Sequence, residues 1–178
     1  MGLPKWKKLN QKSLFKNKHW EYRLDHFEIE NGLKGEYHYV HSPGSTLVIP
    51  IVSHDKIILI NQYRYLNEKE SLEFPCGSVE GNLSLEQNAL KELREETKYS
   101  AKLEKIGEFS PYTGVSNEIC HVYLGKELKP DPLPSDSTEE FELFQYSFTE
   151  MEDLIKNNII WDGLTLSAWI LLKKHINI

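Results

Sequence analysis

Hydrophobic and polar positions alternate with a period of two over residues 19–40, which is the pattern of half-buried β-strands. Glu-Asn-Gly at 30–32 divides this stretch and predicts a hairpin turn. Ser-Pro-Gly at 42–44 then breaks the chain, and two apolar, β-branched runs follow at 46–52 and 56–63. These two runs predict a second, buried hairpin.

The period changes to that of a helix after Ser84, which has the residue type of a helix N-cap. Gln87 stands three residues later and completes a capping box. Leu85, Ala89 and Leu93 follow at intervals of four and form one apolar stripe. The sequence therefore predicts an amphipathic helix with this stripe in the core.

The second half of the chain predicts further strands and two closing helices. The strands are expected at 102–110, 119–124 and 141–148, a loop at 125–137, and helices at 149–157 and 163–176, capped by Thr149 and Asp162. Strands interrupted by one central helix and closed by helices favour an α/β sandwich with a mixed sheet.

The composition suits a single domain. A chain of 178 residues with 39% hydrophobic residues can bury a core, and its net charge of −6 argues against a general nucleic-acid binder. Residues 1–18 differ from the rest because they hold six lysines and no acid. We predict an exposed, partly frayed amino-terminal segment, with a phosphate-binding arm as the alternative.

The apolar segments also predict a location. No apolar run approaches the roughly 18 residues of a membrane-spanning helix, and the amino terminus lacks a signal peptide. We therefore expect a cytoplasmic protein without a membrane partner. Cys76 and Cys120 have no metal-site spacing, and the 7 histidines show no metal-binding pattern.

Three carboxylates on the predicted helix are the candidate chemistry of the chain. Glu92, Glu95 and Glu96 lie at i, i+3 and i+4, so they share one helix face and repel one another. A solvated helix face is the ordinary explanation of such a run. The glycine loop that precedes the helix favours a bound hard cation instead, and oxygen ligands of this kind suit Mg²⁺ or Mn²⁺.

Gly77 and the run Lys91-Glu92-Leu93-Arg94-Glu95-Glu96 resemble the Nudix box. That motif is a glycine, five residues, Glu, seven residues, and then Arg-Glu-apolar-x-Glu-Glu-x-Gly-apolar. The match stays in register over 77–99, but Leu83 replaces the first Glu, Lys91 the Arg and Lys98 the later Gly. The first Glu and the Arg form a supporting salt bridge in the family, so the resemblance implies an altered frame around an intact carboxylate set.

Flanking segments are similar to the ADP-ribose and nucleotide-sugar pyrophosphatase branch of the Nudix hydrolases. They are Pro43-Gly44-Ser45-Thr46, Asn61-Gln62-Tyr63-Arg64-Tyr65, Glu73-Phe74-Pro75-Cys76-Gly77 and residues 110–118. The resemblance implies a Nudix-type α/β/α sandwich with a mixed sheet over 41–178, plus an N-terminal antiparallel β segment at 19–40 that follows the basic segment 1–18. It also implies a homodimer in which the β segment is exchanged between subunits.

The resemblance assigns roles to the acidic residues. Glu92, Glu95 and Glu96 are the expected metal ligands, and the backbone carbonyl of Cys76 completes the set. A general base must come from elsewhere, because metal-bound carboxylates are poor bases. The acidic run 137–142 lies where the branch keeps its catalytic loop. The candidates for the base, in order of preference, are Glu139, Glu140 and Glu142.

Four further residues are candidates for substrate binding. Arg64 matches phosphate geometry but is equally well explained as a strand-end charge. Trp20 and Tyr22 are candidates to stack on a base, although aromatic residues in strands more often lie in a core or an interface. Glu118 is a candidate to contact substrate or metal, or it is a strand-edge charge.

The expected function is metal-dependent hydrolysis of the diphosphate linkage in nucleoside diphosphate sugars, with ADP-ribose as the leading substrate. The products would be a nucleoside monophosphate and a sugar phosphate. GDP-mannose or a dinucleoside polyphosphate are alternative substrates. A catalytically silent nucleotide sensor is the alternative from another class, and Leu83, Lys91 and Lys98 motivate it.

Overall fold

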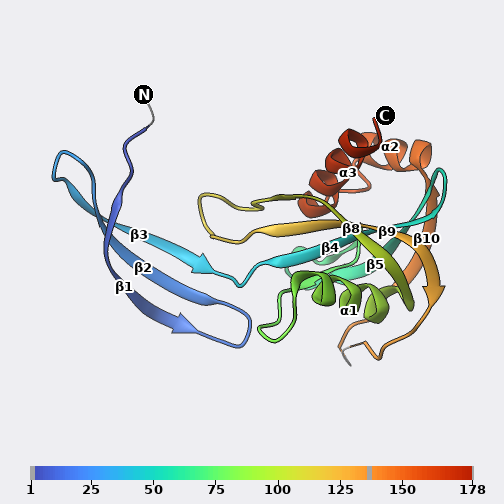
Figure 1. Ribbon diagram of the computed structural model, residues 1–178, viewed down its shortest axis with the longest axis horizontal. Helices are drawn as coiled ribbons and strands as arrows, with labels where there is room; N and C mark the ends of the chain where they lie inside the picture. Colours follow the sequence, from blue (N-terminus) through green and yellow to red (C-terminus); the bar gives the residue numbers. More distant parts are fainter. Residues whose placement is uncertain (1–2, 136–137, 178) are drawn as a thin grey trace.

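The computed structural model describes residues 3–135 and 138–177. Its first three strands form an antiparallel sheet that stands apart from the main body of the molecule (Figure 1). The strands are β1 (Lys7–Lys16), β2 (Glu21–Glu28) and β3 (Lys34–His41). The hairpin predicted for 19–40 is confirmed, with Gly32 in the turn at a φ of 83°.

The expectation of a frayed amino terminus is wrong for most of residues 1–18. β1 pairs with β2 from Lys7 opposite Glu28 to Lys16 opposite Glu21. Every residue of β1 is nevertheless exposed, so the strand is held by its ladder of hydrogen bonds to β2 more than by a core. A lysine-rich strand of this kind lacks the alternation that would reveal it in sequence.

The main body contains a mixed seven-stranded sheet with the order β10-β5-β4-β9-β8, in which β6 also pairs with β5 and β7 with β4. Its strands are β4 (Ser45–Ser53), β5 (Lys56–Arg64), β6 (Lys69–Glu73), β7 (Cys76–Ser78), β8 (Tyr99–Phe109), β9 (Cys120–Pro130) and β10 (Glu142–Ser147). β4 and β9 are parallel, whereas the other named pairs are antiparallel.

The predicted second hairpin forms, but its strands stay together only near the turn. β4 and β5 pair at Ile51 with Ile57 and at Ser53 with Lys56. Beyond this point β4 takes β7 and β9 as its neighbours. The short strand β7, which the sequence does not predict, lies beside β4 where the loop that contains Gly77 begins.

Helices cover both faces of the main sheet (Figure 1). Val48 of β4 packs with Ala89 and Leu93 of α1 (Leu85–Thr97) on one face. The neighbouring residues of β4 face the opposite way and pack with Trp169 of α3 (Gly163–Ile176) and Met151 of α2 (Phe148–Lys156). The predicted α/β/α sandwich is therefore confirmed, and one strand supplies both cores because its side chains alternate.

Several predicted boundaries need correction. The N-cap of α2 is Ser147, not Thr149, because Ser147 and Glu150 form a capping box that fixes the start of the helix. β9 continues to Pro130 through the predicted loop at 125–137. Gly125 lies within this strand, and a Cβ atom there would stand 3.0 Å from Val48 Cγ1. Asp162 caps α3 as predicted.

A short 3₁₀ helix, Tyr65–Asn67, links β5 to β6. Residues 136 and 137, which fall in the predicted loop and at the start of the acidic run, lie outside the described residues.

Candidate active site

A cavity of about 790 Å³ lies between the β7 loop and α1. The turn between β1 and β2 and the segment before β10 complete its wall. The lining residues are Lys18, His19, Pro43, Cys76, Gly77, Ser78, Val79, Glu80, Gly81, Lys91, Glu92, Glu95, Glu96, Pro134, Ser135 and Glu139. Its wall is strongly acidic and holds all three carboxylates of the Nudix box.

Helix α1 directs the carboxylates into this cavity because of how its apolar stripe is buried. The predicted capping box at Ser84 and Gln87 fixes the start of the helix, and Ala89 and Leu93 are fully buried. Glu92 and Glu96 flank this stripe, so they lie at the edge of the core. Glu96 is only 7% exposed and accepts a hydrogen bond of 3.2 Å from the backbone N–H of Cys76.

Gly77 leaves the space that Glu92 occupies. A Cβ atom at position 77 would overlap all three atoms of the Glu92 carboxyl group. Any other residue type would therefore displace either the loop or the carboxylate. The glycine of the motif is required here for close approach rather than for an unusual backbone angle.

A buried asparagine fastens the loop to the helix. Asn88 is fully buried, donates to Thr46 Oγ1 at 2.9 Å and to the Ser78 carbonyl at 3.2 Å, and accepts from the Glu80 N–H at 3.0 Å. A buried amide with all these partners rigidifies the loop. Sequence reasoning missed Asn88, although a polar residue three positions after Leu85 on the buried side was the available signal.

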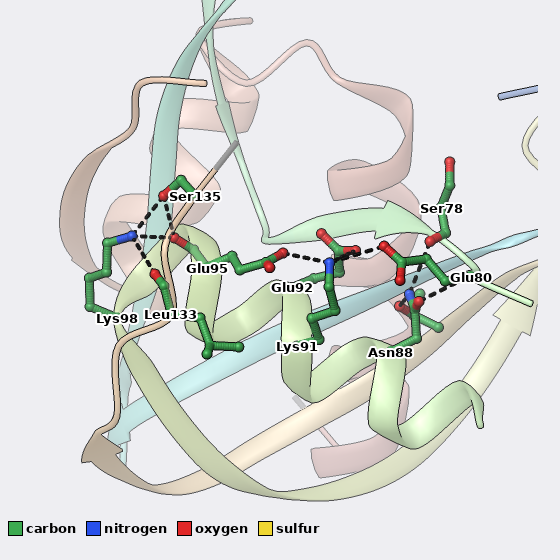
Figure 2. A network of polar contacts seen from close by, with 10 residues as sticks. Ser78, Glu80, Asn88, Lys91, Glu92, Glu95, Lys98, Leu133 and Ser135 are labelled. Atoms are coloured by element: carbon green, nitrogen blue, oxygen red, sulfur yellow. Dashed lines mark hydrogen bonds and ion pairs between the residues drawn. The ribbon is translucent and has the colours of Figure 1, made fainter. Parts of the chain in front are cut away.

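The three positions that depart from the family pattern have identifiable consequences. Figure 2 shows Lys91 among three acidic side chains. Lys91 Nζ lies 2.8 Å from Glu95, 3.1 Å from Glu80 and 3.8 Å from Glu92. Leu83 cannot supply the family's salt-bridge partner, and Glu80 of the same loop takes this place.

Lys98 adopts the left-handed conformation, with φ at 68°, that glycine would otherwise provide at the end of the helix. Its ammonium donates to the carbonyls of Glu95 at 2.6 Å and Leu133 at 3.1 Å, and to Ser135 Oγ at 2.7 Å (Figure 2). These bonds tie the segment that leads to Glu139 to the end of α1.

Burial sets the electrostatics of the carboxylates. Burial raises the pKa of Glu92 to about 7; Lys91 opposes this rise, whereas Glu95 and Glu139 add to it. Burial and the charge of Glu92 raise the pKa of Glu96 well above its ordinary range, against the hydrogen bond from Cys76. Two carboxylates that resist ionisation fit a site completed by a cation.

The donor set fits a hard divalent ion in chemistry: carboxylate oxygens on one helix that line one cavity. Within residues 3–135 and 138–177, however, no three His, Cys, Asp or Glu side chains converge closely enough to form a metal site. The Lys91 ammonium lies among these carboxylates and pairs with them instead. Cys76 lies next to these carboxylates, because its backbone N–H donates a hydrogen bond to Glu96.

The structure separates the three candidates for the general base. Glu139 lines the cavity, and its charge contributes to the raised pKa values of Glu92 and Glu96. Glu140 lines a different cavity, of about 330 Å³, beside Tyr63. Glu142 lies on β10 and accepts a hydrogen bond of 3.4 Å from Asn61.

The four candidates for substrate binding lie outside the wall of the main cavity. Arg64 forms an ion pair with the buried Glu73, including a bond of 2.7 Å from Nε. Glu118 accepts a hydrogen bond of 2.7 Å from Ser45 Oγ.

The two aromatic candidates belong to the N-terminal sheet. Trp20 lines an adjoining cavity of about 200 Å³ that shares Lys18, His19 and Pro43 with the main one. The Tyr22 hydroxyl forms a hydrogen bond with His38 Nδ1 on the same sheet, and the two rings stack. Lys18 and His19 were not singled out in the sequence, although the basic segment 1–18 ends there.

Comparison with known proteins agrees with this geometry. Residues 41–168 match the NUDIX domain. The chain is 31% identical to the methanol dehydrogenase activator of Bacillus methanolicus and 30% identical to the ADP-ribose pyrophosphatase of Bacillus subtilis (strain 168), in each case over 91% of this chain and 89% of the relative. The crystal structure of an ADP compounds hydrolase has a TM-score of 0.85 at 22% identity, covers 99% of this chain and 97% of its own, and shares the fold.

An α/β/α sandwich with a glycine loop and a carboxylate-bearing helix at one cavity is a Nudix-type architecture. The chain belongs to the Nudix family. The resemblance to the ADP-ribose pyrophosphatase branch, and the prediction of a Nudix pyrophosphatase, are confirmed. Among the described residues, the helices are too short or too polar to traverse a membrane.

Proposed function

We propose that this protein hydrolyses the diphosphate linkage of nucleoside diphosphate sugars in a Mg²⁺- or Mn²⁺-dependent reaction, with ADP-ribose as the leading substrate. The observation that carries the proposal is the cavity itself, which Glu92, Glu95, Glu96 and Glu139 line together, with Glu92 seated against Gly77. The 30% identity to an ADP-ribose pyrophosphatase supports the choice of substrate.

Glu92, Glu95 and Glu96 would hold the cation, together with the carbonyl oxygen of Cys76. A bound divalent ion neutralises the phosphate oxygens and makes water more acidic. The chain's own contribution is mainly positioning. The Asn88 network and the stripe of α1 fix the carboxylates before substrate arrives, which lowers the entropic cost of the reaction.

Glu139 would accept the proton of the attacking water. One P–O bond of the diphosphate bridge breaks, the water oxygen bonds to that phosphorus, and the bridging oxygen leaves with the other phosphate. The products are a nucleoside monophosphate and a sugar phosphate. The bonds from Lys98 to Leu133 and Ser135 support the segment that carries Glu139. Glu140 and Glu142 are the remaining candidates for the base.

The basic turn between β1 and β2 would meet the negatively charged substrate. Lys18 lines the main cavity and forms no ion pair among the described residues. Asn17 Oδ1 accepts the N–H groups of His19 and Trp20, each at 2.8 Å, and so shapes the turn. This arrangement favours the phosphate-binding alternative for the end of segment 1–18. Trp20 and Tyr22 would stack on the nucleobase of the substrate. Arg64 and Glu118 would contact the substrate at the margin of the site.

We also propose a homodimer in which residues 19–40 help to build both sites. The support is the exposure of the N-terminal sheet, where Trp6 and Phe15 are 56% and 55% exposed. A three-stranded sheet needs a covered apolar face for stability. Sedimentation would test this proposal, and a monomer at micromolar concentration would contradict it. The accompanying proposal of a cytoplasmic location is open to cell fractionation.

A substrate panel tests the function most broadly. ADP-ribose, GDP-mannose and a dinucleoside polyphosphate would be incubated with the purified protein, with Mg²⁺, Mn²⁺ or a chelator. We expect ADP-ribose to be cleaved fastest and only with a cation. Nucleotide binding without turnover of any compound would instead favour the sensor.

A further inference from the structure

Lys91 is placed among the carboxylates that would bind the metal. Its ammonium lies 2.8 Å from Glu95, 3.8 Å from Glu92 and, on the other side, 3.1 Å from Glu80 (Figure 2). Its side chain is 30% exposed. The positive charge therefore sits within the cavity wall rather than in open solvent.

The two groups of carboxylates that share this ammonium differ in their surroundings. Glu92 and Glu95 have side-chain exposures of 14% and 21%, whereas Glu80 is 55% exposed. The backbone of Glu80 is nevertheless fixed by its bond to Asn88. Glu80 is thus an outer partner that stays within reach of Lys91 and is more accessible to solvent.

We propose that Lys91 is a built-in counter-ion that competes with the divalent cation for Glu92 and Glu95, and that Glu80 holds its ammonium when the divalent cation is bound. The inference rests on the proposed metal site. An ammonium and a divalent ion a few ångströms apart repel strongly, because like charges at this separation are only weakly screened within a cavity wall. Lys91 is therefore a positioning residue that sets the affinity for the cation.

The residue type supports an ammonium that can move. Lysine has a flexible stem and a compact charge with three donors, so it can turn from one carboxylate to another. Arginine, which the family pattern has at this position, would grip carboxylates in a fixed fork. With Leu83 in place of the family's glutamate, Glu80 is the described carboxylate on the loop that pairs with Lys91.

Calorimetric titration of the metal-free protein with Mn²⁺ tests the competition. Lys91→Met keeps most of the stem and removes the charge, so we expect binding at least about fivefold tighter. We expect the melting temperature of the same variant in chelator to fall, because its carboxylates lose their counter-ion. A purely structural role would weaken both properties, so their opposite changes are diagnostic.

Lys102→Met is the matched control, because it removes the same charge from an exposed pair with Glu127 on another part of the molecule. It should leave the affinity for Mn²⁺ within twofold. Unchanged or weaker binding by Lys91→Met would overturn the proposal. If that variant does not fold, the test passes to Glu80→Gln, which alters an exposed loop side chain.

Glu80→Gln removes the partner that receives the ammonium, so we expect Mn²⁺ to bind about threefold to tenfold more weakly. Glu86→Gln on the exposed side of α1 controls for the lost charge and should have little effect. The double variant with Lys91→Met completes the test. If Glu80 acts through Lys91, Glu80→Gln should have no further effect in that background; a persistent loss would make Glu80 a direct ligand and contradict the relay.

The two proposals fail in different ways. Wild-type protein that does not bind Mn²⁺ at millimolar concentration would contradict the proposed metal-dependent function and this inference together. Wild-type protein that binds Mn²⁺, without tighter binding by Lys91→Met, would contradict the counter-ion role alone.

Discussion

The loop-and-helix unit around Gly77 and the N-terminal sheet are built in contrasting ways. In the first, buried groups such as Glu96 and Asn88 are hydrogen-bonded, and the loop is held from several sides. In the second, all residues of β1 are exposed, and aromatic contacts such as Trp6 with Phe27 lie on an open surface. The first region can position reactive groups within one chain. The second region exposes surface that is available for contact with a partner chain.

The largest expected effect lies in the buried unit. Glu96→Gln keeps the shape of the side chain and an acceptor for the Cys76 N–H but removes the charge. Metal-dependent turnover of ADP-ribose should fall at least about 100-fold, because charge stabilisation at the diphosphate depends on this carboxylate. Steady-state kinetics with circular dichroism as a folding check would measure this. Unchanged turnover would contradict the assigned role.

The two regions contain glycines that sharpen the comparison. Gly77→Ala should reduce turnover about tenfold or more, because the added methyl overlaps the carboxyl group of Glu92. Gly35→Ala on β3 is the counterpart. Its Cβ would stand 2.6 Å from the ring of Phe27, a half-buried side chain that does not line the main cavity. It should leave turnover within twofold, and a loss as large as that of Gly77→Ala would break the comparison.

The raised pKa of Glu92 predicts opposite pH dependences for stability and cation binding. Between its ordinary pKa of 4.5 and its folded value of about 7, the folded protein keeps a proton that the unfolded chain has released. The metal-free protein should therefore lose stability as the pH rises through this window, and denaturant titration in chelator would show it.

Cation binding requires the ionised carboxylate, so the affinity for Mn²⁺ should rise with pH up to about 7, by at most about tenfold per unit for one proton. Calorimetry between pH 5.5 and 8 would measure it. A flat affinity profile would contradict the burial argument. Glu96→Gln should make the stability profile shallower, since it removes a second buried carboxylate whose pKa is raised.

The smallest expected effect belongs to the N-terminal region. Lys18→Ala should raise KM for ADP-ribose about twofold to fivefold with kcat within twofold, because an exposed ammonium contributes about 1 kcal/mol at most. Lys12→Ala removes the same charge from the middle of β1 and serves as the control. Equal effects of the two substitutions would show that Lys18 contributes only to the overall charge of the segment, and would contradict a specific contact with the substrate.

The sequence predicts the buried unit well because its signals are local. Ser84 and Gln87 mark the start of α1, and the stripe from Leu85 fixes which face is buried. Contacts between residues that are far apart in the sequence cannot be predicted from such local signals. The parallel pairing of β4 with β9 is one example, and the bond from Asn88 to Thr46 is another.

Some features of the candidate active site could not be predicted from the sequence for a similar reason. Like charges at helical spacing after a glycine loop favour a bound cation, but the distance from Lys91 to Glu80 depends on how the loop folds back. The order of Glu139, Glu140 and Glu142 along an acidic loop does not reveal which one enters the cavity, and only the folded path does so. β1 was missed because its strand conformation comes from pairing with β2 and not from an apolar face of its own.

The most direct test of the account is the fate of ADP-ribose in ¹⁸O-labelled water with Mg²⁺ or with chelator. We expect AMP and a sugar phosphate to form only with the cation, and one of the two products to carry a single ¹⁸O atom. ADP-ribose that is bound but left intact with both Mg²⁺ and Mn²⁺ would contradict it.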